Sequence, residues 1–571
     1  MDRKIWATFA WMNFYETDAR RLALWVQYES SLREALEAWH RRTYWCAFPE
    51  EPKAYGEEVL AQGETAFKSQ LNRPFERLRQ PARRWLLSDE VSPYTREPLG
   101  ISYPQVDVAE ALYHAQEALS RWRWVPYTER IGLLMESIHR FSKHFSEVAQ
   151  ATMHTTGQAW MMAFQASGPH AADRAVEALA VAYEELSHIP PYVRWTRELG
   201  KGQAVIDKYF IPQPEGLSLH IGVSTFPVWN VLPGLYASLA VGSPVLMKPH
   251  PRAIYPIAVV VSILQSTFEE YGLPPTIVQL IPDTVAEPIT KTLAEHPLIR
   301  IIDYTGSTEF GNYLESLPGK ITFLEKAGVN GVLIESVEDM EAVAKNLAFS
   351  ASLYSGQMCT APQNIYIPRE GIRTAQGILS YEEVVAALTK AIEDLASHPK
   401  AAPAVLGALQ NEGVVQRIER LAQMASVRRA PQAYTHPQYA AARTLTPIVA
   451  EPSDESLTRT EHFGPRLLTI PVENAQRGLE VLYEIAREKG MLSCAIYTTD
   501  ADFKQKAIRL LAEAAIPISF NYRGQVFINQ SVAFSDFHGT GGNPAGNASF
   551  TDAAFVVKRF RWIGVRDCLQ G

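Results

Sequence analysis

The pattern of hydrophobic and polar positions divides the chain into helical and alternating stretches. Residues 1 to about 95 show apolar side chains at helical spacing, interrupted at residues 48–52, at Pro74 and at Pro81. The apolar run at residues 5–14 reads as a helix start, because it is short for a signal peptide and acidic residues follow it without a small-residue cleavage site. We therefore expect a separate helical segment in front of the main body.

From residue 106 the pattern changes to long amphipathic helices. Residues 106–122 and 127–154 carry apolar side chains at every third or fourth position, which suits helices packed on a sheet. Residues 193–210 alternate polar and apolar side chains around Gly200 and Gly202, as in a β-hairpin. A short strand is expected at residues 217–223.

Beyond this point strands and helices alternate. Strands are expected at residues 244–248, 277–281, 300–304 and 320–323, and helices at 256–271, 286–295 and 340–351. This rhythm is typical of parallel βαβ units, which bind ligands at the carboxyl ends of their strands. A second α/β block occupies residues 326–530, and residues 553–565 alternate like an edge strand.

Size and composition narrow the class of protein. The 571 residues exceed the roughly 250 to 300 at which one hydrophobic core stops growing, so we expect two or more domains. The hydrophobic share of 47% and the charged share of 20% are ordinary for globular chains. With a net charge of -8 and no Lys/Arg block longer than a pair, nucleic acid is not an expected partner.

The cysteines and the apolar runs bear on the compartment. Cys46, Cys359, Cys494 and Cys568 lie far apart without a Cys-x-x-Cys pair, which predicts neither a disulfide framework nor a metal site and fits a reducing cytoplasm. The apolar stretch at residues 231–247 is interrupted by prolines and glycines and falls short of the ~20 residues that span a bilayer. No membrane span is expected.

Two residues supply a nucleophile and a base. Cys359 follows the expected helix at 340–351 in a turn of small residues, where a thiol can be presented to a ligand. Glu325 stands at the end of the strand that begins at residue 320. Alone, such a cysteine is more often a small core residue, and the glutamate could be a surface charge paired with Lys326. Together they provide what acyl transfer through a thioester requires.

Five segments make the chain resemble the aldehyde dehydrogenase superfamily over about residues 96 to 566. They are Thr-Phe-Pro-Val-Trp-Asn at 225–230, Met-Lys-Pro at 247–249, Tyr-Thr-Gly-Ser-Thr-Glu at 304–309, Leu-Glu at 324–325 with Gly-Gln-Met-Cys at 356–359, and Glu-His-Phe-Gly-Pro at 461–465. Each has an ordinary structural reading, such as a surface lysine, a helix N-cap or a turn. Their order and approximate spacing are those of the motifs of that family.

The resemblance implies a fold and a division of the chain. The expected fold is α/β, with a Rossmann-type cofactor domain, an α/β catalytic domain, an oligomerisation arm and an N-terminal helical extension. The expected ranges are 1–95 for the extension, 96–192 and 215–325 for the cofactor domain, 326–530 for the catalytic domain, and 193–214 with 550–571 for the arm. A homodimer or homotetramer is implied.

The resemblance also implies a mechanism. Cys359 attacks an aldehyde, hydride passes to the nicotinamide, and Glu325 activates the water that releases the carboxylic acid. The oxyanion is stabilised in the family by the cysteine N–H and an asparagine amide, and here Thr225 stands at the asparagine position. Losing one such donor typically costs on the order of 3 kcal/mol, so Thr225 or another group must compensate.

Further positions are implied to hold the cofactor. Lys248 corresponds to the lysine of the ribose, Gly306 and Ser307 to the phosphate turn, and Glu461 and Phe463 to the segment at the nicotinamide riboside. Free N–H groups at a helix start suit a pyrophosphate.

Near the ribose lysine the sequence departs from many relatives. The glutamate that repels a 2′-phosphate is absent after Lys248, whereas His250 and Arg252 could meet that phosphate. We therefore expect NADP, with NAD possible. The turn at residues 281–284 also lacks the usual glycines.

A narrower resemblance concerns the substrate. Residues 44–50 and 53–57, with the Ser-Thr-Phe-Pro and Lys-Pro-His-Pro variants at 224–227 and 248–251, are similar to PaaN-type phenylacetate-degradation proteins. That branch implies a small-molecule aldehyde linked to CoA, of the 3-oxo-5,6-dehydrosuberyl-CoA semialdehyde type. The alternatives are a CoA-acylating aldehyde dehydrogenase, against which Glu325 argues, and a catalytically weak structural relative, which should lack saturable cofactor binding.

Overall fold

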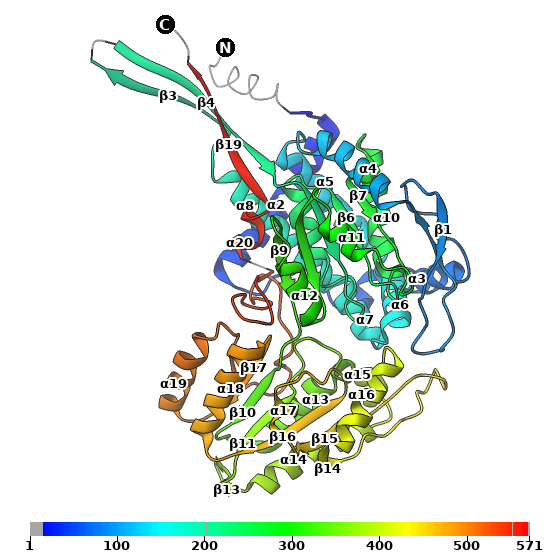
Figure 1. Ribbon diagram of the computed structural model, residues 1–571, viewed down its shortest axis with the longest axis vertical. Coiled ribbons are helices and arrows are strands. Elements are labelled where there is room, and N and C mark those ends of the chain that lie inside the picture. The colour runs from blue at the N-terminus through cyan, green and yellow to red at the C-terminus, as the bar shows by residue number, and fades with distance from the viewer. Residues whose placement is uncertain (1–14, 201, 551, 569–571) are drawn as a thin grey trace.

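The computed structural model describes residues 15–200, 202–550 and 552–568, which form a body with two main sheets (Figure 1). In the first sheet the order is β7-β6-β5-β8-β9 and all pairs are parallel. Its strands are β5 (Leu217–Ile221), β6 (Val245–Lys248), β7 (Val278–Leu280), β8 (Ile299–Thr305) and β9 (Ile321–Glu325). β5, β6 and β7 are buried along their whole length, as expected when crossover helices cover both faces. The expected alternation of strands and helices is confirmed.

Helices surround this sheet. They are α4 (Val108–Trp122), α5 (Tyr127–Ser142), α6 (Phe145–Thr156), α7 (Trp160–Ser167), α8 (Pro169–Ser187), α9 (Leu232–Ala240), α10 (Tyr255–Glu270), α11 (Thr290–Glu295) and α12 (Thr308–Glu315). The single helix expected at 127–154 is wrong, because a tight turn at Lys143 and His144 separates α5 from α6. α11 begins later than the expected residue 286, since Pro288 lacks the N–H of a helix interior.

The second sheet has the order β14-β15-β16-β11-β10-β17-β18 and lies in the lower part of Figure 1. Its strands are β10 (Gly331–Ile334), β11 (Asn364–Pro368), β14 (Ala425–Arg429), β15 (Ile448–Pro452), β16 (Arg466–Val472), β17 (Cys494–Tyr497) and β18 (Ser519–Phe520). Its helices are α13 (Met340–Ser352), α14 (Tyr381–Ser397), α15 (Ala401–Leu406), α16 (Glu412–Gln423), α17 (Glu455–Thr458), α18 (Ala475–Lys489) and α19 (Ala501–Ala512), and a side hairpin pairs β12 (Ile372–Thr374) with β13 (Gly377–Leu379). Only the β14–β15 pair of the large sheet is antiparallel.

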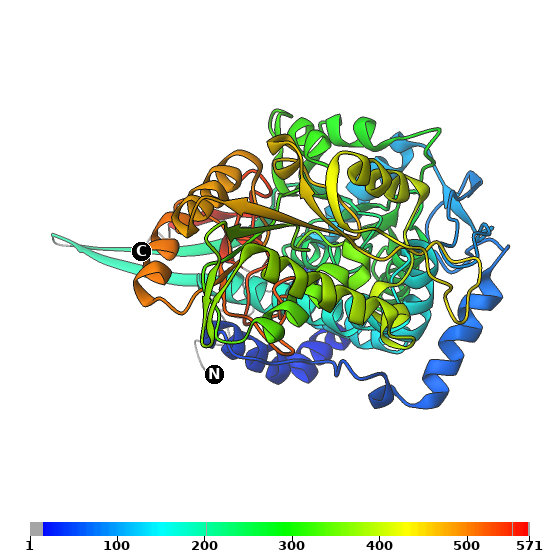
Figure 2. The ribbon, with the colours of Figure 1, turned by 90° about the horizontal axis from the view of Figure 1, so that it is seen from below.

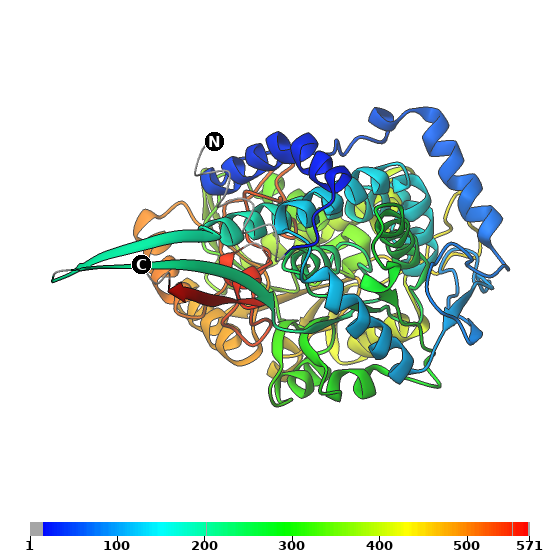
Figure 3. The same cartoon turned by 90° about the horizontal axis from the view of Figure 1, so that it is seen from above.

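A three-stranded arm projects from the body (Figures 2 and 3). It consists of β3 (Tyr192–Leu199), β4 (Gly202–Pro214) and β19 (Phe560–Cys568), with β4 in the middle and both pairs antiparallel. The hairpin expected from the alternation at 193–210 is therefore present. The strand expected at 553–565 is partly wrong: α20 (Ala553–Val557) comes first, because the Asp552 side chain caps its N-terminus by accepting from Phe555 N at 2.9 Å.

The N-terminal extension lies along the outside of the helical layer. α2 (Ala19–Arg41) packs on α5 and α8, a 3-10 turn spans Pro52–Tyr55, and α3 (Glu57–Gln70) packs on α6. β1 (Arg84–Leu87) then pairs with β2 (Ser102–Gln105), a pairing that the helical spacing did not indicate. The helix start expected at residues 5–14 lies outside the described residues. Among the helices that the structure describes, none is both long and apolar enough to cross a bilayer.

Candidate active site

Cys359 follows α13 on a loop with an unusual backbone. Tyr354, Ser355 and Gly356 have φ values of 53°, 51° and 62°, all in the left-handed region. For residues other than glycine this conformation costs of order 1–3 kcal/mol each, so the surrounding structure must hold it. The Tyr354 hydroxyl donates to Thr156 O at 2.6 Å, and the Ser355 hydroxyl donates to Leu406 O at 2.9 Å. The turn that presents the thiol is therefore fixed from two sides.

Asn330 fixes the backbone of Cys359, the predicted nucleophile. Its amide donates to Cys359 O at 2.7 Å and to Ala361 O at 3.1 Å, while its carbonyl accepts from Leu492 N at 2.9 Å. Asn330 directly precedes the central strand β10. Its hydrogen bonds therefore hold Cys359 in a fixed position relative to the second sheet.

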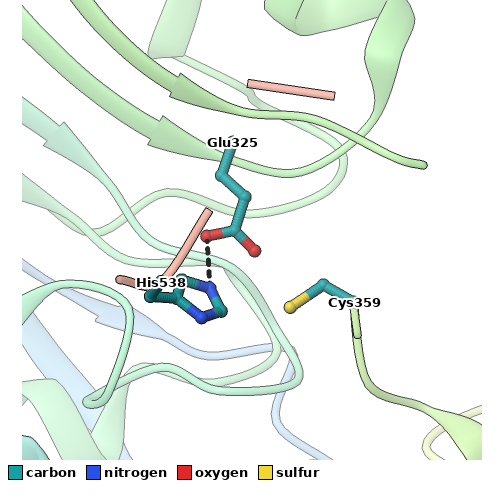
Figure 4. Close-up of side chains that lie close together, drawn as sticks. All are labelled: Glu325, Cys359 and His538. Atoms are coloured by element: carbon teal, nitrogen blue, oxygen red, sulfur yellow. Dashed lines mark hydrogen bonds and ion pairs between the residues drawn. The ribbon is translucent and has the colours of Figure 1, made fainter. Parts of the chain in front are cut away.

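Glu325 ends β9 beside the end of β8. Its backbone carbonyl accepts from Gly306 N at 3.0 Å, which joins it to the turn after β8. Its Oε2 accepts two hydrogen bonds, from Asn230 Nδ2 at 3.2 Å and from His538 Nε2 at 3.2 Å (Figure 4). Asn230 also donates to Thr305 Oγ1 at 3.4 Å.

The nucleophile and the base predicted from the sequence meet at this point. The Cys359 sulfur, a Glu325 carboxylate oxygen and a His538 ring nitrogen lie within 4.8 Å of one another, and the second carboxylate oxygen is on the Cys359 side (Figure 4). Thiol, imidazole and carboxylate are also zinc ligands, so this group is chemically able to bind that ion, although the sequence predicts no metal site.

The pKa values of Glu325 and Cys359 are shifted in opposite directions. Burial raises the pKa of Glu325, but the charge of His538 and hydrogen bonds from His538, Cys359 and Asn230 bring that pKa below its usual value. Burial raises the pKa of Cys359 well above its usual value, and the charges of Glu325 and Glu461 raise it further. A carboxylate thus faces a protonated thiol, and the arrangement can move one proton from sulfur to oxygen.

Thr225 lies in the loop between β5 and α9. Gln158 Nε2 donates to Thr225 O at 2.8 Å, and the next residue, Phe226, packs edge-on against Tyr354 of the nucleophile turn at 5.7 Å. The Thr225 hydroxyl makes no hydrogen bond to a described residue. It is therefore free to donate to a ligand.

Lys248 ends β6 and is buried. Its ammonium lies 2.6 Å from Asp283 Oδ1, and both side chains are at most 3% exposed. Burial lowers the pKa of Lys248, and the charge of Asp283 opposes this effect. The sequence had indicated Asp283 only as part of a turn without glycine.

Of the two residues expected to meet a 2′-phosphate, His250 differs from the expectation in its charge. Burial lowers the pKa of His250 to about 4, and the charges of Lys248 and Arg252 add to that effect, so the ring is neutral at pH 7. The Arg252 side chain is exposed, and its backbone N–H donates to His250 Nδ1 at 3.2 Å. Of these two residues, only Arg252 offers a charge to a phosphate.

Gly306 and Ser307 form the N-terminal end of α12. Ser307 Oγ accepts from Phe310 N at 3.3 Å, and a Cβ at Gly306 would lie 2.3 Å from the Tyr304 hydroxyl oxygen. A side chain is therefore excluded at residue 306, which keeps the backbone of this turn accessible to a phosphate.

Glu461 and Phe463 stand beside the nucleophile loop. Gln363 Nε2 donates to Thr460 O at 2.9 Å, and a Cβ at Gly356 would lie only 2.4 Å from Gly464 O, so the two segments are in contact. Burial raises the pKa of Glu461 to about 7, against the charges of Arg466 and Arg417. No described residue donates a hydrogen bond to this carboxylate, which suits it to ribose hydroxyls. The ammonium of Lys248, the N-terminal end of α12 and the carboxylate of Glu461 are together groups that fit a nicotinamide dinucleotide.

Sequence reasoning missed three residues of the site. Asn230 lay within a quoted segment without a role, and Asn330 was not singled out. His538 is separated from Glu325 by 213 positions, and no pattern in the sequence pairs them. The only available signal for Asn230 was its place in the loop after a strand end.

Comparisons with known proteins show which sequences and folds this chain is similar to. The sequence model described as "Aldehyde dehydrogenase family" matches residues 87–547. A crystal structure of an NAD-dependent aldehyde dehydrogenase from Burkholderia multivorans is similar with a TM-score of 0.94 and 42% identity, covering 97% of this chain and 100% of that one. A 1-pyrroline-5-carboxylate dehydrogenase from Thermus with bound NAD has a TM-score of 0.73 at 20% identity, covering 92% and 99%, and shares the fold. Aldehyde dehydrogenase LUC3 of a Fusarium species is 25% identical over 426 residues, which are 72% of this chain and 82% of that protein.

Proposed function

Because the chain belongs to the aldehyde dehydrogenase family, whose members oxidise aldehydes with NAD(P)+, we propose that Cys359 is the nucleophile and Glu325 the base of this reaction. The observation that carries the proposal is the Glu325 carboxylate held within 4.8 Å of the Cys359 thiol. Glu325 takes the thiol proton, and the thiolate attacks the aldehyde carbonyl. The bound nicotinamide cofactor supplies the acceptor for hydride. Glu325 must next release this proton to solvent. It then removes a proton from the water that attacks the thioester, which frees the carboxylic acid and returns Cys359 as the thiolate.

The oxyanion formed by attack needs donors. We assign this role to the backbone N–H of Cys359 and to the Thr225 hydroxyl, which has no other partner among the described residues. Both belong to segments that contact each other through Phe226 and Tyr354. Asn330 and the left-handed turn keep the N–H of Cys359 in place for this purpose.

The substrate we propose is a CoA-linked semialdehyde of the type formed after ring opening in phenylacetate degradation. The support is the resemblance at residues 44–50, 53–57, 224–227 and 248–251. The test is an aldehyde panel that includes CoA-linked semialdehydes and free aliphatic aldehydes, with kcat/KM measured for each. Higher values for the CoA-linked compounds are expected, and equal or lower values would contradict the substrate. Formation of acyl-CoA in place of free acid would instead identify the CoA-acylating alternative.

For the cofactor we propose a preference for NADP+. The support is the missing carboxylate after Lys248 and the exposed charge of Arg252. Fluorescence titration with both cofactors tests it, because tighter binding of NAD+ would contradict the preference. Arg252→Ala should weaken NADP+ binding and leave NAD+ binding unchanged. Arg509→Ala, at an exposed arginine on α19, is the matched control.

The remaining assignments concern the ranges of the chain. We propose that residues 96–192 with 215–325 hold the cofactor, that 326–530 carry the nucleophile, and that 193–214 with 550–571 mediate a homodimer or homotetramer. Sedimentation of the full chain and of a chain ending at residue 559 would test the arm. We also place the protein in the cytoplasm, where a free thiol at Cys359 persists.

A further inference from the structure

The geometry points to His538 as a positioning residue that holds the carboxylate of Glu325 in its working orientation. This inference rests on the proposed role of Glu325 as the base. His538 lies in the loop of residues 527–538, called here the histidine loop. Its side chain is 5% exposed and that of Glu325 is 6% exposed, so water does not screen their contact.

The direction of the hydrogen bond follows from the chemistry of the two groups. An ionised carboxylate can only accept, so His538 Nε2 carries the hydrogen and donates to Glu325 Oε2 at 3.2 Å. Asn230 donates to the same oxygen. Since both donors occupy Oε2, the carboxylate plane is fixed and Oε1 is left facing Cys359 (Figure 4). The oxygen that must receive protons is thereby kept free of competing donors.

The other ring nitrogen of His538, Nδ1, lies at the end of a chain of hydrogen bonds. Arg174 Nη2 donates to Ser531 Oγ at 3.0 Å, which leaves the Ser531 hydroxyl hydrogen for His538 Nδ1 at 3.4 Å. The Arg174 guanidinium is itself buried and paired with Glu177 at 2.9 Å. This order of donors selects the tautomer with hydrogen on Nε2, which is the one that Glu325 requires.

Aromatic rings prevent the imidazole from turning. Trp229 meets the His538 ring edge-to-face, with centroids 4.5 Å apart and planes at 82°, and Phe550 packs at 5.1 Å on a tilted plane. Trp229 directly precedes Asn230. The same loop therefore supplies the ring that packs against His538 and the second hydrogen-bond donor to Glu325.

The histidine loop is fixed to the body and to the nucleophile. Phe534 N donates to Glu177 Oε1 at 2.8 Å, and the Thr360 hydroxyl donates to Asn529 O at 2.7 Å. The N-terminal extension covers the loop from outside, with Trp45 edge-on to Phe534 at 4.9 Å. One loop therefore connects the residue after Cys359 with the histidine that holds Glu325.

The test compares two amides at residue 538. In His538→Gln the amide nitrogen can reach the position of Nε2, whereas in His538→Asn it ends near the position of Nδ1. Misplacement of a reacting group by about 1 Å can cost on the order of 100-fold. We expect His538→Asn to slow deacylation by roughly 10- to 100-fold, with His538→Gln within a few-fold of wild type. The burst of reduced cofactor should keep its amplitude in both variants.

The pH profile of deacylation separates positioning from a structural effect. At that step Cys359 is acylated, so the Glu325 carboxylate keeps its hydrogen bonds from His538 and Asn230 but no longer receives one from a thiol. Because the hydrogen bond from His538 lowers the pKa of Glu325, losing that bond in His538→Asn should move the acid limb of deacylation to higher pH. Thermal melting and cofactor titration establish that both variants are folded. Deacylation by His538→Asn at the wild-type rate, or His538→Gln as slow as His538→Asn at equal thermal stability, would overturn the inference. Turnover of Glu325→Gln at the wild-type rate would instead contradict the proposed role of Glu325 as the base. A failure of the His538 inference and a failure of the proposed function therefore give different results.

Discussion

Replacing Glu325 by Gln separates the two halves of the reaction. The carboxamide oxygen can take the place of Oε2, since both of its partners, Asn230 and His538, are donors. The carboxamide nitrogen is then directed at Cys359, and it cannot accept a proton from a thiol or from water. The variant therefore keeps its shape and cofactor site but loses the base.

The size of the effect follows from the role. A general base typically raises the rate by about 100- to 10,000-fold, which is about 2.7 to 5.5 kcal/mol of the activation barrier. Glu325 is the carboxylate of the described group that it forms with Cys359 and His538, so no second carboxylate of this group can replace it. One equivalent of reduced cofactor per Cys359 should form and then turnover should slow by that factor. The burst itself should be slower, because Glu325 also takes the thiol proton.

Rapid mixing with aldehyde and cofactor measures the burst, and intact mass detects the acyl group on Cys359. Hydroxylamine is a useful addition, because this strong nucleophile attacks a thioester without a base and should restore turnover to Glu325→Gln. Steady turnover at the wild-type rate without a trapped acyl group would refute the reasoning.

Two further predictions concern burial. Arg559 is fully buried and donates to both oxygens of Asp303 at 2.6 and 2.7 Å, so Arg559→Met should destabilise the fold by about 3 to 5 kcal/mol in urea denaturation, while Arg561→Met at an exposed position should cost less than about 1. In the cofactor-free enzyme, burial and the charge of Glu325 raise the pKa of Cys359, so its alkylation by iodoacetamide should accelerate with pH throughout the neutral range. In Glu325→Gln the rate of alkylation should rise at lower pH than in the wild type. An unchanged pH profile of alkylation would contradict the effect of the Glu325 charge on the pKa of Cys359.

The strand ends of the first sheet could be predicted from the sequence, and the reason is local. Lys248, Ser307 and Glu325 each follow a short apolar run, and parallel strands bring such ends to one edge. The hairpin of the arm was equally visible, because its alternation spans β3 and most of β4. In both cases the information lies within one short stretch of the chain.

Other features depend on contacts that no local pattern contains. The left-handed backbone at Tyr354 is unfavourable by itself and exists because Thr156 and its neighbours hold it. His538 is important only because the fold places it against Glu325. The division of the helix at Lys143 was hidden because Phe141 and Phe145 are both buried and continue the apolar spacing across the turn.

The position of the histidine loop has a consequence for synthesis. α8 leaves the ribosome early, but the partner of Glu177, Phe534, follows 357 residues later, and the contact of Trp45 with Phe534 spans an even longer separation. Contacts of such long range form late, because the entropy of closing the intervening chain must be overcome first. A nascent or truncated chain can therefore build the first sheet and its cofactor turn before it acquires an oriented base. An oriented Glu325 therefore requires that translation has passed His538, so products terminated before the histidine loop are expected to bind cofactor without turning over.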